Sequence, residues 1–166
     1  LLAYSEDVPT GFTGKSLDLR AGNVAVEVAN TASTDTGYVN TFDGGVSSKM
    51  TIAFWAKGFP NDWAPWISKR GEDGIGWQVR RFANSTGPCF TLRGVDNEDA
   101  GGSPLNLSTP LEWRHFAAVW DQETGPRSLY VDGVLSHTVY NGFGQNMSLA
   151  AATHLGIGGR QGSGPG

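Results

Sequence analysis

A short aromatic loop is the strongest candidate for a binding site in this sequence. The segment Phe59-Pro60-Asn61-Asp62-Trp63-Ala64-Pro65-Trp66 places three large aromatic rings around two prolines. An aromatic ring can pack on the apolar C–H face of a neutral sugar, while nearby amide and guanidinium groups bond its hydroxyls. Proline restricts such a loop and lowers the entropy lost on binding. The candidate ligand contacts here are Phe59, Asn61, Trp63 and Trp66.

Trp63 has two competing interpretations. It lies between polar residues and has no strand alternation to bury it, which favours an exposed, ligand-facing ring. A loop tryptophan can equally cap the end of a hydrophobic core, where burial of its large ring stabilises the fold. The sequence leaves both readings open, and Trp63 ranks above Trp66 as a ligand contact.

A neighbouring predicted strand, residues 75–82, supplies polar candidates. Alternate residues of a strand share a face, so two polar side chains of this strand are expected on an outer face. Two more polar residues follow closely in sequence. These second-rank ligand contacts are Gln78, Arg80, Arg93 and Asn97.

Other chemistry is poorly supported by the sequence. Gly14-Lys15-Ser16 has Pro9 where a phosphate-binding loop needs glycine, and a strand is predicted to follow it. The single cysteine, Cys89, is predicted to be an inert core residue. One carboxylate pair, Asp121 and Glu123, has the spacing of alternate strand residues, but it opens a turn. We therefore expect no catalytic residues and no enzymatic activity.

Composition narrows the class of protein further. The chain has 166 residues, 17% of them charged, a net charge of −4, 24 glycines and six tryptophans. That length allows one domain, and the scattered basic residues exclude a nucleic-acid footprint. No apolar run approaches the ~20 residues that span a bilayer, so membrane insertion is not expected.

The hydrophobic pattern predicts an all-β fold. Period-two alternation recurs along the chain, turn residues separate the segments, and no helical periodicity competes. Asp132-Gly133 between two apolar strands predicts a two-residue type I′ hairpin. About ten short strands at this spacing indicate a β-sandwich or jelly roll. The main predicted strands are residues 16–19, 24–28, 50–57, 65–69, 75–82, 89–94, 113–121, 127–131, 134–140 and 154–158.

Several of these strands carry a family resemblance. Trp113–Asp121, followed by Gly125 and Leu129-Tyr130-Val131-Asp132-Gly133, resembles the W-x-H-x-A-x-x-W/Y-D…G…L-Y-V-D-G pattern of laminin-G-like, concanavalin A-like jelly-roll domains. Gly14–Leu19 and Met50–Lys57 resemble two further strands of that family. The resemblance spans roughly residues 14–160 and implies a two-sheet antiparallel β-sandwich.

The family strands also assign three tryptophans. Their positions imply that Trp55, Trp113 and Trp120 belong to the core. Phe54 and Trp55, however, are successive strand residues and must point to opposite faces. One of those two rings therefore faces away from the core unless a loop covers it.

The resemblance also bears on domain organisation and metals. It suggests an N-terminal extension at residues 1–10, a jelly-roll domain at 11–160 and a flexible Gly-rich tail at 161–166. The sequence lacks the family's usual last strand. The favoured explanation is a piece of a longer chain; the alternatives are a strand supplied by another chain and a variant without that strand. No cofactor is required, but family members often hold a structural calcium ion at the sandwich rim. A solvated acidic loop is the favoured reading of the calcium candidates Asp43, Asp96 and Asp99.

Together these features predict a non-catalytic carbohydrate-binding or adhesion module of a larger secreted or cell-surface protein. Its partner would be a glycan or a surface polysaccharide. The alternative is a structural or protein–protein interaction domain of an extracellular assembly, bound to other domains or to copies of itself. A divergent glycan-cleaving enzyme ranks third, because the E-x-D-x-x-E string of glucanases sharing this fold is absent.

Overall fold

A computed structural model describes residues 3–19, 26–28, 49–58, 63–70, 76–82, 87–93, 112–121, 124–140 and 154–159, with backbone only at 27, 28 and 93. Eleven strands and no helix occur in these segments. All strand pairs among these residues are antiparallel. The predicted all-β class is confirmed. Within the described segments, no helix is long and apolar enough to cross a bilayer.

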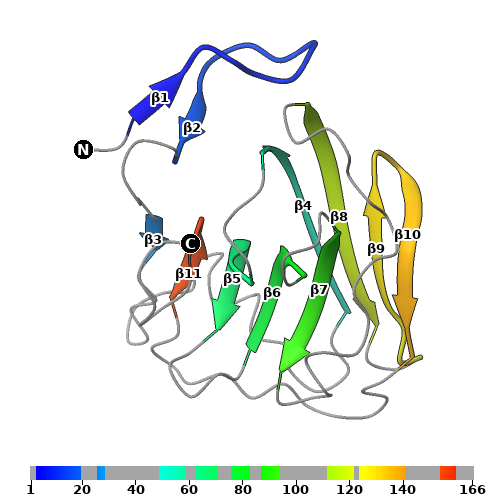
Figure 1. Cartoon of the computed structure of the whole chain (residues 1–166). Coiled ribbons are helices and arrows are strands. Elements are labelled where there is room, and N and C mark those ends of the chain that lie inside the picture. The colour runs from blue at the N-terminus through cyan, green and yellow to red at the C-terminus, as the bar shows by residue number, and fades with distance from the viewer. Residues whose placement is uncertain are drawn as a thin grey trace.

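One layer of the molecule is a four-stranded sheet with the order β10-β9-β8-β4 (Figure 1). It consists of β4 (Lys49–Lys57), β8 (Trp113–Asp121), β9 (Arg127–Val131) and β10 (Val134–Val139). Strands β4 and β8 pair along their whole length, from Lys49 opposite Asp121 to Lys57 opposite Trp113. Because partners in an antiparallel pair share a face, this register decides which side chains meet.

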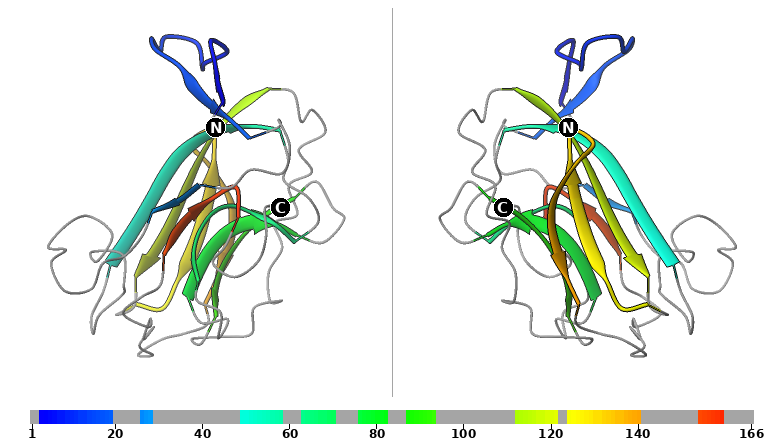
Figure 2. Two further views of the ribbon diagram at one scale, coloured as in Figure 1. Left: turned by 90° about the vertical axis from the view of Figure 1, so that its left-hand side faces the viewer. Right: turned by 90° about the vertical axis from the view of Figure 1, so that its right-hand side faces the viewer.

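The second layer is a five-stranded sheet with the order β3-β11-β5-β6-β7. It consists of β3 (Val26–Val28), β11 (Leu155–Ile157), β5 (Pro65–Arg70), β6 (Gly76–Arg81) and β7 (Pro88–Arg93). Strand β11 confirms the predicted strand at 154–158. It pairs with β3 on one side and β5 on the other, although both strands are distant from it along the chain. Figure 2 shows this sheet facing the four-stranded one across the core.

The core lies between the two sheets and draws on both. Trp77 and Val79 of β6 pack with Trp120 of β8 and Ile52 of β4, all at or below 5% exposure. Burial of these aromatic rings and branched side chains away from water is the main contribution to the stability of a β-sandwich. The alternation read from the sequence therefore placed the apolar face of these strands correctly.

Two of the three tryptophans that the family strands assigned to the core lie elsewhere. Trp120 is fully buried, but Trp55 and Trp113 belong to the outward-facing rows Trp55–His115 and Lys57–Trp113. Phe54 points inward and stacks on Phe116 at 5.2 Å, so Trp55 must point outward. The second core tryptophan is Trp77, which comes from the other sheet.

A two-stranded hairpin precedes the sandwich. Strands β1 (Ala3–Ser5) and β2 (Ser16–Asp18) pair with Ala3 opposite Asp18, across the predicted domain boundary at residue 10. The sequence pattern missed β1, because a three-residue strand is too short to show alternation. The boundary at 160 and the tail at 161–166 lie outside the described residues and stay predictions.

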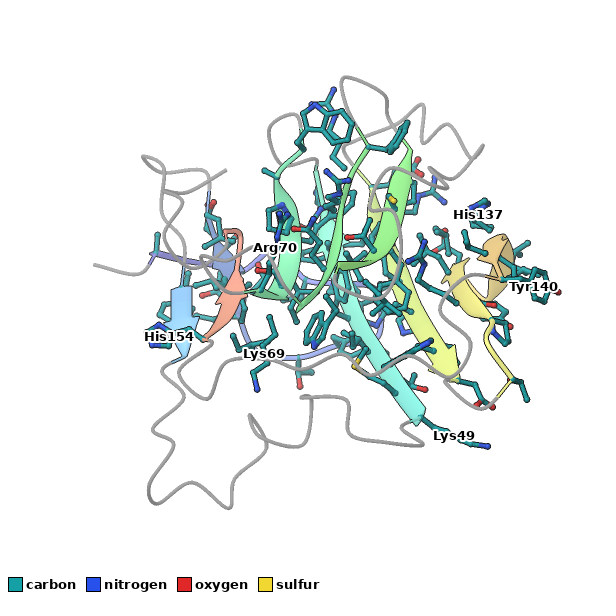
Figure 3. The ribbon with its side chains drawn as sticks, turned by 90° about the horizontal axis from the view of Figure 1, so that it is seen from below. Lys49, Lys69, Arg70, His137, Tyr140 and His154 are labelled. Carbon is teal, nitrogen blue, oxygen red and sulfur yellow. The ribbon has the colours of Figure 1, made fainter. Side chains whose placement is uncertain are left out.

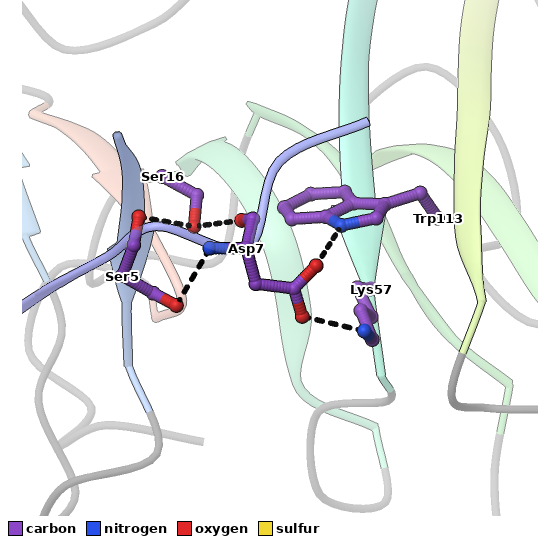
Figure 4. Close-up of polar contacts among 5 residues, drawn as sticks. All are labelled: Ser5, Asp7, Ser16, Lys57 and Trp113. Carbon is purple, nitrogen blue, oxygen red and sulfur yellow. Dashed lines mark hydrogen bonds and ion pairs between the residues drawn. The ribbon is translucent and has the colours of Figure 1, made fainter. Parts of the chain in front are cut away.

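Asp7 attaches this hairpin to the four-stranded sheet (Figure 4). Its carboxylate accepts a hydrogen bond of 2.8 Å from Nε1 of Trp113 and forms an ion pair with Lys57. Asp7 N donates to Ser5 Oγ, and Ser16 Oγ donates to the carbonyl of Asp7, which shapes the loop itself. The anchor thus fixes the hairpin at the outer face of β4 and β8.

The predicted type I′ hairpin is present between β9 and β10. Asp132 and Gly133 both have positive φ, 52° and 79°. The Asp132 carboxylate accepts from the backbone N–H of His115 at 2.9 Å and pairs with Arg114 at 2.7 Å. The turn is therefore stabilised by β8 as well as by its own conformation.

Candidate functional site

Trp63 lies two residues before β5 and is 41% exposed. The guanidinium carbon of Arg80 is 4.6 Å from the centroid of the Trp63 ring. Phe82 contacts the same ring edge-on, with centroids 5.4 Å apart. An exposed aromatic ring is thus held in place by a cation and by a second ring. We call Trp63, Arg80 and Phe82 the Trp63 cluster.

Pairing of β5 with β6 brings this cluster together. Pro65 lies opposite Arg80, and Arg81 N donates a 3.0 Å hydrogen bond to the carbonyl of Ala64. These contacts set the turn that carries Trp63 beside the end of β6. Trp63 itself has a φ of 65°, a left-handed conformation that costs a non-glycine residue about 1–2 kcal/mol.

Two polar candidates, Gln78 and Arg80, share the face of β6 that points away from the core. Gln78 pairs with Ser68 and Thr91, a polar row across three strands, while Trp77 and Val79 face inward. The predicted orientation is thus correct.

The expected solvent exposure of that face is wrong. Gln78 is 1% and Arg80 3% exposed, and Ser68 and Thr91 are equally buried. Contact with the Trp63 ring contributes to the cover over Arg80. Trp63 is therefore the exposed member of this set, and Gln78 and Arg80 lie beneath the surface.

Trp66 lies apart from Trp63. The ladder of β5 and β6 is irregular between Pro65 and Ile67, and this bulge lets Trp66 pack against the core. Its ring is 5.0 Å from that of Phe116, and its Nε1 donates to the carbonyl of Gly58 at 3.1 Å. The two tryptophans of the predicted aromatic loop therefore do not form one surface.

The remaining predicted site residues cannot be placed. Within the described segments, no group of three or more His, Cys, Asp or Glu could hold a metal ion. The predicted ligand contacts Phe59, Asn61 and Asn97 lie outside the described residues, and so does the side chain of Arg93. The calcium candidates Asp43, Asp96 and Asp99 also lie outside them. These residues stay predictions.

A second aromatic group lies on the outer face of the four-stranded sheet and includes Trp55, for which the family resemblance implied a core position. The ring of Trp55 is 5.2 Å from that of His115 and 5.6 Å from that of Phe12. The sequence signal for an outward-facing Trp55 was the alternation along β4. Ile52 and Phe54 lie on the inner face of this strand, so Trp55 lies on the outer face. Phe12 carried no such signal, since only the hairpin brings it to this sheet.

Comparison with known proteins agrees with this architecture. Residues 31–166 match the family model of the concanavalin A-like lectin/glucanases superfamily, and the chain belongs to that superfamily. No curated protein matches the sequence.

Two solved structures are similar in fold. Domain 4 of AbnA, a GH43 extracellular arabinanase from Geobacillus stearothermophilus determined in complex with arabinotriose, is 12% identical with a TM-score of 0.50. That match covers 85% of this chain and 76% of the other. A native heptameric SAP-like pentraxin from Limulus polyphemus is 19% identical with a TM-score of 0.45. It covers 71% of this chain, which spans about half (54%) of the pentraxin chain.

Proposed function

We propose that this chain is a non-catalytic carbohydrate-binding or adhesion module of a larger secreted or cell-surface protein, with Trp63 as its stacking ring. The observation that carries the proposal is the exposed Trp63 ring held by Arg80 and Phe82. A ring fixed before the ligand arrives loses little entropy on binding. Its exposed surface offers a sugar the apolar contact that C–H groups need.

Strain at Trp63 is a second support. A tryptophan in the left-handed region costs free energy that glycine or asparagine would avoid. Such strain is found preferentially at binding sites, where it positions a side chain for its ligand. Here the left-handed backbone of Trp63 positions its indole beside the end of β6.

A non-catalytic role is supported by how three described carboxylates are used. Glycoside hydrolysis needs two carboxyl groups flanking the bond that breaks. Asp7 pairs with Lys57, Asp121 with Lys49, and Asp132 with Arg114. Asp7, Asp121 and Asp132 also accept hydrogen bonds from Trp113 Nε1, Thr124 N and His115 N, respectively. Each of these carboxylates is thus engaged in a contact that stabilises the sandwich.

The alternative role, a protein-interaction domain, is favoured by the surface of β10. Val134 and Leu135 are more than half exposed at the tip of this strand. Exposed apolar side chains on an edge strand often mark contacts between proteins. Self-association of the purified chain, lost on Leu135→Asp, would favour this role over the leading one.

Glycan binding is tested directly with the intact chain. A panel of neutral oligosaccharides and insoluble polysaccharides is used, including arabinotriose, with and without chelation of calcium. We expect binding to at least one probe and a loss of about tenfold or more in Trp63→Ala. Tyr140→Ala is the matched control, because Tyr140 is 76% exposed and follows β10 of the four-stranded sheet (Figure 3), whereas the Trp63 cluster lies at β5 and β6 of the other sheet. Absence of binding to every probe, or equal loss in both variants, would contradict the proposal.

A further inference from the structure

We propose a second carbohydrate-binding site, on the outer face of the four-stranded sheet and centred on Trp55. It needs no residue of the Trp63 cluster, which belongs to the five-stranded sheet. The side chains that form this Trp55 patch share outward-facing rows of β4, β8 and β9 and are Thr51, Ala53, Trp55, His115, Ala117 and Tyr130.

The register of three strands gives the patch its shape. Ala53 pairs with Ala117, which pairs with Tyr130, and the next row places Trp55 opposite His115. The two alanines are small, so the rings of Trp55, His115 and Tyr130 project beyond them. Adjacent strands are about 4.8 Å apart, so the row from Ala53 to Tyr130 spans roughly 10 Å. A short saccharide can lie on the alanines with rings beside it.

The Trp55 ring is both accessible and braced. It is 41% exposed, yet it contacts Phe12 edge-on at 5.6 Å and His115 at 5.2 Å. Phe12 reaches Trp55 because Asp7 anchors the N-terminal hairpin to Lys57 and Trp113 (Figure 4). The stacking surface is therefore fixed by a contact between segments far apart in sequence, which lowers the cost of ordering it on binding.

Two polar groups of the patch have hydrogen-bonding capacity to spare. The imidazole of His115 and the hydroxyl of Tyr130 take part in no hydrogen bond within the described part of the chain. Both side chains are half-buried. The backbone of His115 is already satisfied, since it exchanges hydrogen bonds with Asp132. A polyhydroxylated ligand on Trp55 would meet a donor and acceptor at each of these side chains.

Charge and desolvation favour a neutral sugar over other partners. The described charges around the patch are already paired. Lys57 pairs with Asp7 and Lys49 with Asp121 at the two ends of β4, and Arg114 pairs with Asp132, whose carboxylate also accepts from His115 N. The patch thus offers no cation to an acidic ligand. A flat apolar protein surface would bury His115 and Tyr130 without hydrogen bonds, which opposes binding, whereas sugar hydroxyls satisfy both. We therefore assign the patch to a neutral glycan rather than to a second copy of the chain.

The test uses the intact chain in the background of Trp63→Ala, titrated with arabinotriose, xylohexaose and cellohexaose. We expect residual binding in Trp63→Ala, a further loss of about tenfold or more with Trp55→Ala, and about fivefold weakening with Tyr130→Phe. Tyr130→Phe removes only the hydroxyl, so it keeps the test informative if Trp55→Ala perturbs folding. Tyr140→Ala is the control and should bind as its parent does.

Each other outcome overturns the second site. If Trp63→Ala loses all binding, the proposed function stands and the Trp55 patch is not a site. If Trp55→Ala and Tyr130→Phe bind every probe as tightly as the parent, the patch takes no sugar. If Trp55→Ala instead abolishes a dimer detected by light scattering, the face is an interface between copies.

Discussion

The guanidinium of Arg80 lies against the ring of Trp63, 4.6 Å from its centroid. This contact joins a buried cation on β6 to the exposed aromatic ring that precedes β5. The exposed side chain of Trp63 is therefore in contact with a side chain that belongs to the sheet. In the proposed function, the contacts of the Trp63 cluster are already formed before a ligand arrives, which lowers the entropy lost on binding.

Replacing Trp63 separates its strain from its contacts. Trp63→Gly and Trp63→Ala both lose the contacts to Arg80 and Phe82, but only alanine keeps the steric cost of a φ of 65°. We expect the glycine variant to be more stable than the alanine variant by about 1 kcal/mol, although both bind glycan more weakly than the parent. Urea unfolding measures the difference. A more stable alanine variant would show that the turn does not hold the left-handed conformation in solution.

The hairpin between β9 and β10 depends on Asp132. Asp132→Ala removes the acceptor for His115 N and the partner of Arg114, and it leaves a Cβ-bearing residue without side-chain hydrogen bonds at a φ of 52°. We expect a loss of about 1–2 kcal/mol in unfolding free energy. Asp132→Asn keeps an acceptor and tolerates the conformation, so its loss should be less than half as large. Equal losses would assign the stabilisation to the ion pair alone.

Gly156 marks a close approach of the chain to itself. A Cβ at this position would lie 2.4 Å from the carbonyl oxygen of Gly159 and 3.2 Å from Ser68 Oγ. Those two atoms are already joined by a 2.8 Å hydrogen bond, so neither can yield alone. Gly156→Ala should therefore cost about 2–3 kcal/mol, measured by urea unfolding.

Gly11→Ala is the control for that substitution. Its added Cβ would meet nothing within 4 Å, so it carries only the strain of a φ of 88°. We expect its cost to be near 1 kcal/mol. If Gly156→Ala costs no more than this, the segment at Gly159 moves aside freely and does not close over β11.

His137 makes stability depend on pH. Burial, and then the positive charge of Arg127, lower the pKa of His137 from its ordinary value of 6.5. As pH falls below about 6.5, the unfolded chain takes up a proton at this residue before the folded chain does. The unfolding free energy should therefore decrease as pH falls through that value, and this contribution should be constant at higher pH.

His137→Gln should remove that part of the pH dependence. The measurement is urea unfolding at a series of pH values from 8 down to about 5, where His residues change charge. Because the side chain is only partly buried, the effect should be small and best seen as a difference between parent and variant. An unchanged slope in the variant would place the titration on other groups.

Much of the fold was predictable from the sequence because strands with one buried face impose period two on it. The alternation of Ile52 and Phe54, the pair Trp77 and Val79, and the Asp132-Gly133 turn each predicted local structure that the chain adopts. The same alternation oriented Gln78 and Arg80 away from the core. These features depend only on neighbours along the chain, and the sequence by itself determined them.

The composition of the two candidate surfaces was decided by tertiary structure. Trp63 met Arg80 and Phe82 only when β5 paired with β6, and a bulge at the same place turned Trp66 into the core. Phe12 reached Trp55 through the anchored hairpin, 43 positions away in the printed sequence. Pairing between strands and contacts between loops are set by packing across the whole molecule, so no local pattern encodes them.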